Sequence, residues 1–169
     1  LVSNKGLLMN SKASAITIEG GTLSSAGKIS AYSLSMTGGT LDVTNGKPMG
    51  ISLKDAFVAT DGADIDLYGA LTANQLTLEG VHFTLAMDAA DIAPKVLPKA
   101  QSITLKGKNV LNTVSDSELD IAGKVSVTGD LALLDSVVML HDVAGAAKPK
   151  AQGLTVKGVL IADGTELGT

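Results

Sequence analysis

The 169-residue chain contains no cysteine and no tryptophan, and its thirteen basic residues are all lysine. Without cysteine, disulfides cannot stabilise the fold, a condition that does not by itself define the compartment. Without arginine, the chain lacks the planar guanidinium group that makes paired hydrogen bonds to phosphate, carboxylate or guanine. Because the net charge is −4 and no basic patch is visible, we expect no nucleic-acid partner.

Long apolar runs are missing as well. No segment approaches the roughly 20 apolar residues that span a bilayer, so no membrane span is expected in this segment. Residues 1–10 lack the ordered charged, apolar and small-residue regions of a signal peptide. The chain has no initiator methionine and opens in the middle of its repeat pattern. We therefore expect residues 1–169 to be a single domain and a fragment of a longer secreted chain.

The apolar residues that are present are mostly mid-sized aliphatics. Hydrophobic residues make up 45% of the chain, whereas aromatic residues make up only 2%. This composition favours a narrow, repetitive interior over an irregular globular core. Glycine, serine, threonine, aspartate and asparagine separate the apolar positions, as tight turns between strands require.

Internal repeats carry the strongest signal. The segment Pro98–Gly107 (PKAQSITLKG) recurs as Pro149–Gly158 (PKAQGLTVKG), at an offset of 51 residues. The sequence Gly-Gly-Thr-Leu occurs at residues 20–23 and again at 38–41, at an offset of 18. A looser phrase is shared by residues 23–31, 65–73 and 119–127. These offsets predict coils of roughly 17–18 residues, with 51 residues near three coils.

Within each repeat, apolar and polar residues alternate with a period of two, which indicates strands with one buried face. Glycine-containing pairs interrupt the strands. We therefore predict a right-handed parallel β-solenoid (β-helix). An antiparallel β-sandwich is the alternative, because short strands with frequent turns also suit it. Two proline-containing segments, Asp88–Lys99 and His141–Gln152, break the pattern and are expected to be equivalent loops outside the strands.

The phrases Glu19–Ile29 (EGGTLSSAGKI) and Leu119–Leu133 (LDIAGKVSVTGDLAL) resemble the β-strand repeats of bacterial autotransporter passengers and filamentous-haemagglutinin-like adhesins. The resemblance covers the chain from Ile16 to about Gly164, apart from the two proline segments. It implies a secreted scaffold on the bacterial outer surface. It implies no catalytic residues within the repeats themselves.

Metal and nucleophile chemistry have little support in the sequence. Two histidines and no cysteine exclude the standard zinc frameworks. The segment Asp61–Asp66 (DGADID) has alternating carboxylates like an oxygen-rich calcium loop, but it lacks the distal glutamate. We expect no metal and no cofactor. His82 is interpreted as a surface histidine and His141 as a strand-end residue.

Paired carboxylates are the one source of acid–base chemistry. Asp64 and Asp66 fall on the same face of an expected strand, about 7 Å apart, and stacked coils could bring a further carboxylate closer. Such groups, with Asp61, could hydrolyse a glycosidic bond or share a proton as in an aspartic peptidase. The sequence favours the simpler interpretation that Asp61, Asp64 and Asp66 are hydrated surface carboxylates.

Two functions are therefore carried forward, and the sequence favours the non-enzymatic one without excluding an enzyme. The first is a structural or adhesive surface module that binds host or matrix glycoconjugates or acts as a stiff spacer. Its partners would be a host glycoprotein or glycan, or neighbouring solenoid segments, at a secreted or bacterial outer-surface location. The second is an extracellular aspartic-type peptidase or glycosidase that acts on host glycoproteins.

Overall fold

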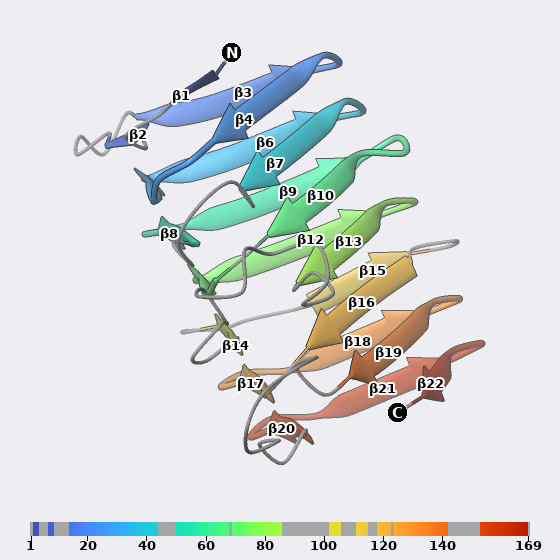
Figure 1. Ribbon diagram of the computed structural model, residues 1–169. Helices are drawn as coiled ribbons and strands as arrows, with labels where there is room; N and C mark the ends of the chain where they lie inside the picture. Colours follow the sequence, from blue (N-terminus) through green and yellow to red (C-terminus); the bar gives the residue numbers. More distant parts are fainter. Residues whose placement is uncertain are drawn as a thin grey trace.

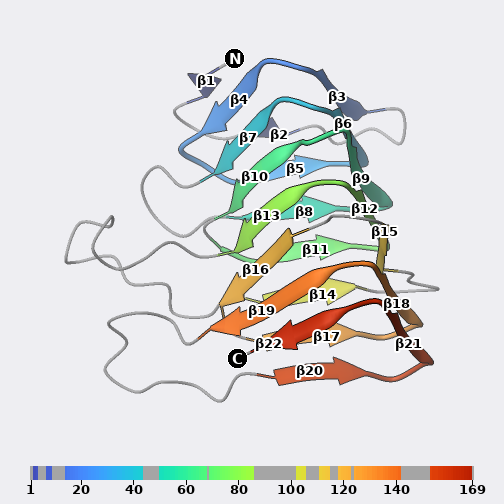
Figure 2. The ribbon, with the colours of Figure 1, turned by 90° about the vertical axis from the view of Figure 1, so that its right-hand side faces the viewer.

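The computed structural model describes residues 2–3, 7–8, 14–43, 50–67, 69–85, 102–105, 111–114, 118–122, 124–141 and 153–168. Within this part of the chain the regular structure consists of 22 β-strands and no helix (Figure 1). The strands belong to three sheets, named A, B and C, that run along the same stack (Figure 2). No helix that is long and apolar enough to cross a membrane occurs among the described residues.

Sheet A has eight strands, and sheets B and C have seven each. Sheet A consists of β1 (Val2–Ser3), β4 (Thr22–Ser25), β7 (Thr40–Val43), β10 (Asp64–Leu67), β13 (His82–Leu85), β16 (Glu118–Ala122), β19 (Val137–His141) and β22 (Glu166–Gly168). Sheet B consists of β2 (Leu7–Leu8), β5 (Ile29–Ala31), β8 (Ile51–Leu53), β11 (Leu71–Ala73), β14 (Ser102–Leu105), β17 (Lys124–Val127) and β20 (Gly153–Val156). Sheet C consists of β3 (Ala15–Glu19), β6 (Ser33–Thr37), β9 (Ala56–Thr60), β12 (Gln75–Glu79), β15 (Leu111–Val114), β18 (Leu131–Leu134) and β21 (Leu160–Asp163).

Each strand pairs in parallel with the strand three positions later in the sequence. Three consecutive strands, one from each sheet, therefore make one coil, and successive coils stack from the N-terminal to the C-terminal end (Figures 1 and 2). This all-β arrangement of parallel strands is consistent with the predicted parallel β-solenoid. The antiparallel sandwich is wrong, because every pairing between described strands is parallel.

The short sequence repeats mark equivalent positions on the stack. Leu23 and Leu41, the leucines of the two Gly-Gly-Thr-Leu copies, pair directly between β4 and β7. The three copies of the looser phrase also begin at equivalent positions. Their first residues belong to one column of paired residues in sheet A: Leu23, Ile65 and Leu119. These repeats are therefore copies of the same structural position.

The long repeat, Pro98–Gly107 and Pro149–Gly158, spans fewer coils than predicted. Ile103 pairs with Val125, and Val125 pairs with Leu154, so the repeat spans two coils instead of three. Coil length varies because the connections between strands vary. Phe83 and its partner Leu119 are twice as far apart in the sequence as Leu23 and Leu41.

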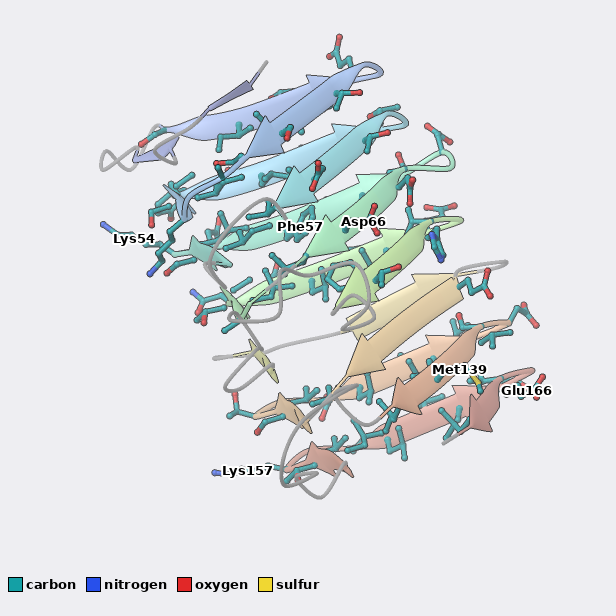
Figure 3. All side chains as sticks on the ribbon, in the orientation of Figure 1. Lys54, Phe57, Asp66, Met139, Lys157 and Glu166 are labelled. Atoms are coloured by element: carbon teal, nitrogen blue, oxygen red, sulfur yellow. The ribbon has the colours of Figure 1, made fainter. Side chains whose placement is uncertain are left out.

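The core consists of mainly aliphatic columns, because alternate residues of a strand face the same side of its sheet. In sheet C, Leu34, Phe57 and Leu76 lie in one column and are at most 1% exposed. Phe57 lies inside the stack in Figure 3. Phe83 in sheet A is also fully buried. The two phenylalanine side chains are thus inserted into columns that are otherwise aliphatic.

The connections between sheets differ in length and in backbone conformation. The turn from sheet C to sheet A is tight and uses positive φ angles, as at Gly39 (φ 76°) and Asp61 (φ 57°). The predicted proline loops, residues 88–99 and 141–152, both fall between a strand of sheet A and the next strand of sheet B. Apart from His141 at the end of β19, these two segments lie outside the described residues.

Candidate functional site

Acidic residues are concentrated on the outer face of sheet A. The described strands of this sheet contain six acidic residues and no lysine. Each acidic residue occupies a position that alternates with the inward columns. We call the members with described side chains the acidic face; they are Asp42, Asp64, Asp66, Glu118 and Glu166.

The side chains of Asp64 and His82 are in close polar contact on this face. They pair in register between β10 and β13, and Nδ1 of His82 lies 3.1 Å from Oδ1 of Asp64. The two side chains are 46% and 49% exposed, for His82 and Asp64 respectively. Exposed pairs of this kind contribute little to stability, at most about 1 kcal/mol. The contact can nevertheless hold the imidazole and the carboxylate in a defined orientation.

Asp66 lies beside a second carboxylate. It pairs in register with Asp42 of β7 and with Thr84 of β13. Partial burial, followed by the charges of Asp64 and Asp42, raises the pKa of Asp66, against smaller lowering effects from His82 and a hydrogen bond from Thr84. At this position on the sheet, the protonated form of the Asp66 carboxyl group is favoured more than it would be in water.

Of the three predicted site residues, two lie together on one strand and the third lies in a turn. Asp64 and Asp66 lie on the same outer face of β10, as predicted. Stacking places a third carboxylate, that of Asp42, in register with Asp66. Asp61 lies instead in the exposed turn before β10, where its Oδ2 accepts a hydrogen bond from the Thr60 hydroxyl at 3.3 Å.

Two members of the site were missed by the sequence reasoning. Asp42 was not singled out, although it occupies the position one coil before Asp66. Its Oδ2 accepts a hydrogen bond from the Ser24 hydroxyl at 3.2 Å. His82 does lie on an outward position, but it contacts Asp64. The Leu23–Leu41 repeat sets the register of β4 and β7 alone, so it signals neither Asp42 beside Asp66 nor His82 beside Asp64.

Metal binding finds no support on this face. In the described part of the chain, no group of three or more histidine, aspartate or glutamate side chains is placed to hold a metal ion. Asp66, with its raised pKa, is suited to hold or donate a proton.

A different surface lies on sheet B. In register, six neighbouring strands of this sheet each contribute one serine or threonine to a single column of paired residues. Because neighbouring strands are about 4.7–4.9 Å apart, the hydroxyl residues repeat at that spacing along the stack. We call this set the hydroxyl ladder; it comprises Ser30, Ser52, Thr72, Thr104, Ser126 and Thr155.

The lysines of the described chain flank the hydroxyl ladder. Lys28 directly precedes β5 and Lys124 begins β17, while Lys54 follows β8 and Lys157 follows β20. Lys54 and Lys157 project from one side of the stack in Figure 3, whereas Asp66 and Glu166 lie toward the other. Positive charge thus borders sheet B, and negative charge is carried by sheet A.

These features define an all-β protein of parallel strands in stacked sheets, with an acidic face and a lysine-bordered hydroxyl face. Comparisons of the chain with protein-family models, with curated proteins and with solved structures found no match.

Proposed function

We propose that this chain is a structural and adhesive surface module of a secreted, bacterial autotransporter-like protein. The observation that carries the proposal is the hydroxyl ladder with its flanking lysines, which runs along a stack with a mainly aliphatic core. A regular exposed face on a stiff support suits the binding of an extended ligand. The module would lie outside the cell, at the outer surface or in secreted form.

Stiffness follows from the way in which the coils stack. Each coil contacts only its neighbours, and the buried apolar side chains from β3 to Val81 and Phe83 and from β17 to β19 belong to one hydrophobic cluster. The eight strands of sheet A span about 34 Å along the stack at the usual strand spacing. Such an element keeps its length under load better than a flexible linker of the same residue count.

We also propose that the coils wind in a right-handed sense. The basic coil would have 18 residues, which is the offset between the two Gly-Gly-Thr-Leu copies. Parallel strands joined by crossovers in one sheet are almost always right-handed, which supports this hand. The Leu23–Leu41 and Ile65–Phe83 pairs share the same sequence separation, which supports the basic coil. Longer coils then contain insertions at the corners.

The proposed ligand is a glycoconjugate with anionic groups. Serine and threonine hydroxyls donate and accept hydrogen bonds, as the hydroxyls of a sugar chain require. Lysine side chains would neutralise carboxylate or sulfate groups, in a salt-dependent manner. The acidic face of sheet A would repel the same ligand, so binding would be confined to sheet B.

Binding to immobilised dextran sulfate, with neutral dextran as the reference, tests this function. We expect salt-sensitive binding to the sulfated polymer that weakens strongly in the double variant Lys54→Glu/Lys157→Glu. The double variant Glu118→Gln/Glu166→Gln, on the acidic face, is the matched control and should bind at least as well as wild type. Equal loss in both variants, or no binding by wild type, would refute the proposal.

A second candidate, extracellular hydrolysis through paired carboxylates, is favoured by one observation. Asp66 has a raised pKa and lies on the same strand face as Asp64. A general acid beside an ionised carboxylate is the pairing that glycosidases use. Hydrolysis of mucin-like or polysaccharide substrates that is lost in Asp64→Asn and in Asp66→Asn, with unchanged folding, would replace the adhesive proposal.

A further inference from the structure

Lys54 and Lys157 occupy equivalent positions at one edge of sheet B. Lys54 directly follows β8, and Lys157 directly follows β20. The backbone N–H of each lysine donates a hydrogen bond to the carbonyl oxygen of the last residue in the strand one coil earlier, Ala31 at 3.3 Å and Val127 at 3.0 Å. Both side chains are exposed and project from the same side of the stack (Figure 3). The two lysines therefore belong to one line of positions parallel to the stack.

We call this line the edge line; its described members are Lys54, Asn74, Thr128 and Lys157, all of which are exposed. Asn74 directly follows β11, and Thr128 directly follows β17. Between them the sequence has Lys106 directly after β14, and this residue lies outside the described part of the chain. In the sequence, a lysine therefore follows every second one of these five strands. Strands two apart in a sheet are separated by about 9–10 Å.

The edge line runs beside the hydroxyl ladder. Lys54 comes two residues after Ser52, and Lys157 comes two residues after Thr155. Two residues of an extended chain span about 7 Å and face the same side. Among the described residues, neither the edge line nor the hydroxyl ladder contains an aspartate or a glutamate. Together they form a strip of hydroxyl groups and positive charge without negative charge.

The ammonium groups of both lysines are available to a ligand. Within the described part of the chain, neither group lies within 4.0 Å of a carboxylate, and the ion pair that is present joins His82 to Asp64 on sheet A. An anionic ligand would therefore not have to displace an internal partner of Lys54 or Lys157 before it binds.

We propose that this strip binds a linear polysaccharide that lies along the stack and in which acidic and neutral sugars alternate. The proposal rests on the adhesive function described above and narrows its ligand class. An extended chain of pyranose sugars advances by close to one strand spacing per sugar, so that its hydroxyl groups can follow the hydroxyl ladder coil by coil. Carboxylates on every second sugar then recur at the interval of the lysines. A ligand laid across the strands would meet only one lysine of the edge line.

The separation of the two lysines makes the length of the ligand important. β8 and β20 are four strand spacings apart in sheet B, about 19 Å along the stack. A sugar chain must therefore span five coils to contact both Lys54 and Lys157. Once one end is bound, the second contact forms within the same complex and strengthens binding at little further cost. A shorter chain reaches only one of the two lysines.

The first experiment compares binding to two carboxylate polymers. In hyaluronan acidic and neutral sugars alternate, whereas in polygalacturonate every sugar is acidic. Thr128→Lys places a charge at a neutral position of the edge line, so it should raise the affinity for polygalacturonate about threefold or more and change that for hyaluronan less than about twofold. Thr128→Ser is the matched control and should change neither affinity. An equal increase for both polymers would overturn the match between lysines and alternate sugars.

The second experiment measures binding of hyaluronan oligosaccharides to Lys54→Gln and Lys157→Gln. A hexasaccharide is long enough to span the five coils, and a tetrasaccharide is not. Each variant should lower the affinity for the hexasaccharide about threefold or more, but that for the tetrasaccharide less than about twofold, because the tetrasaccharide can bind at the remaining lysine. Lys28→Gln, at the opposite edge of sheet B, is the matched control and should have little effect on either. Losses that do not depend on ligand length would refute binding along the stack.

Failure of this proposal can be distinguished from failure of the adhesive function. If wild type binds dextran sulfate but neither charge spacing nor ligand length affects the variants as described, the adhesive function stands and the alternating ligand is refuted. If wild type binds neither dextran sulfate nor hyaluronan, both are refuted. Circular dichroism of every variant verifies that the strands are retained, so a loss of folding is not mistaken for a loss of binding.

Discussion

Asp42 and Asp66 lie in register on β7 and β10, so two carboxylates from successive coils occupy neighbouring positions on the outer face of sheet A. Burial and the charges of Asp64 and Asp42 together raise the pKa of Asp66 above its ordinary value of 3.8. The folded protein therefore binds this proton more tightly than the unfolded chain does.

The raised pKa predicts a pH dependence of stability. The stabilising contribution of protonated Asp66 is present below its ordinary pKa and is lost as the pH rises through the raised pKa. The free energy of unfolding of wild type should therefore fall, relative to that of Asp66→Asn, between acidic and neutral pH. Urea unfolding of both proteins across this range measures the difference.

Asp42→Asn provides the control for this prediction. Removal of the neighbouring charge should lower the pKa of Asp66, which NMR titration of its carboxyl group measures directly. A wild-type pKa of Asp66 at or below its ordinary value would show that the carboxylates do not interact as the structure indicates.

Gly39 is expected to be intolerant of a side chain. Its φ angle is +76°, and a Cβ atom would lie 2.5 Å from the carbonyl oxygen of Gly21 on the neighbouring coil. Gly39→Ala should lower the free energy of unfolding by about 1–2 kcal/mol from the positive φ alone, and further through the clash. Gly62→Ala shares the positive φ (+70°) but meets no atom within 4 Å. Equal losses in the two variants would contradict the close approach of the coils.

Phe57 fills the centre of an inward column and is fully buried. Phe57→Ala should reduce the free energy of unfolding by about 3–5 kcal/mol, because it removes apolar contacts and leaves a cavity. Val58→Ala, at the next and outward position of β9, should have a much smaller effect. Chemical denaturation compares them, and similar losses would mean that β9 is not oriented as described.

Deletion of one coil tests the repeat architecture. Removal of residues 22–39 takes out β4, β5 and β6, one strand from each sheet, and joins Gly21 to Thr40 so that the Gly-Gly-Thr-Leu turn is kept. The shortened chain should fold, because coils interact only with their neighbours. Its urea m value should fall, since less surface is exposed on unfolding.

A half-coil deletion is the matched control. Removal of residues 22–30 leaves the following strands in the wrong sheet, and cooperative unfolding should be lost. If the half-coil variant retained cooperative unfolding while the full-coil variant lost it, the three-sheet order would be incorrect.

Strand character and repeat positions were predictable because both are local. The alternation of Leu76, Thr77 and Leu78 follows directly from the period of a strand, and β12 has that burial pattern. The Gly-Gly-Thr-Leu repeat could be aligned because no insertion separates its two copies. The long proline-led repeat was misjudged because its interval includes connections of unequal length, which add residues without adding strands.

The candidate site was only partly predictable for the same reason. Asp64 and Asp66 alternate with an apolar residue on one strand, so their common face could be inferred from strand geometry. The contact of His82 with Asp64, and the position of Asp42 beside Asp66, depend on how neighbouring coils align. Alignment between coils depends on the length of every intervening connection, which a single sequence does not reveal.

The sequence by itself determined that the protein is built of short strands with aliphatic inner faces, because apolar residues alternate and glycine pairs interrupt them. Only the tertiary structure decided that the strands pair in parallel in three sheets, because pairing depends on contacts between residues of successive coils that are distant in the sequence. The same stacking gathers carboxylates on sheet A and hydroxyl residues on sheet B.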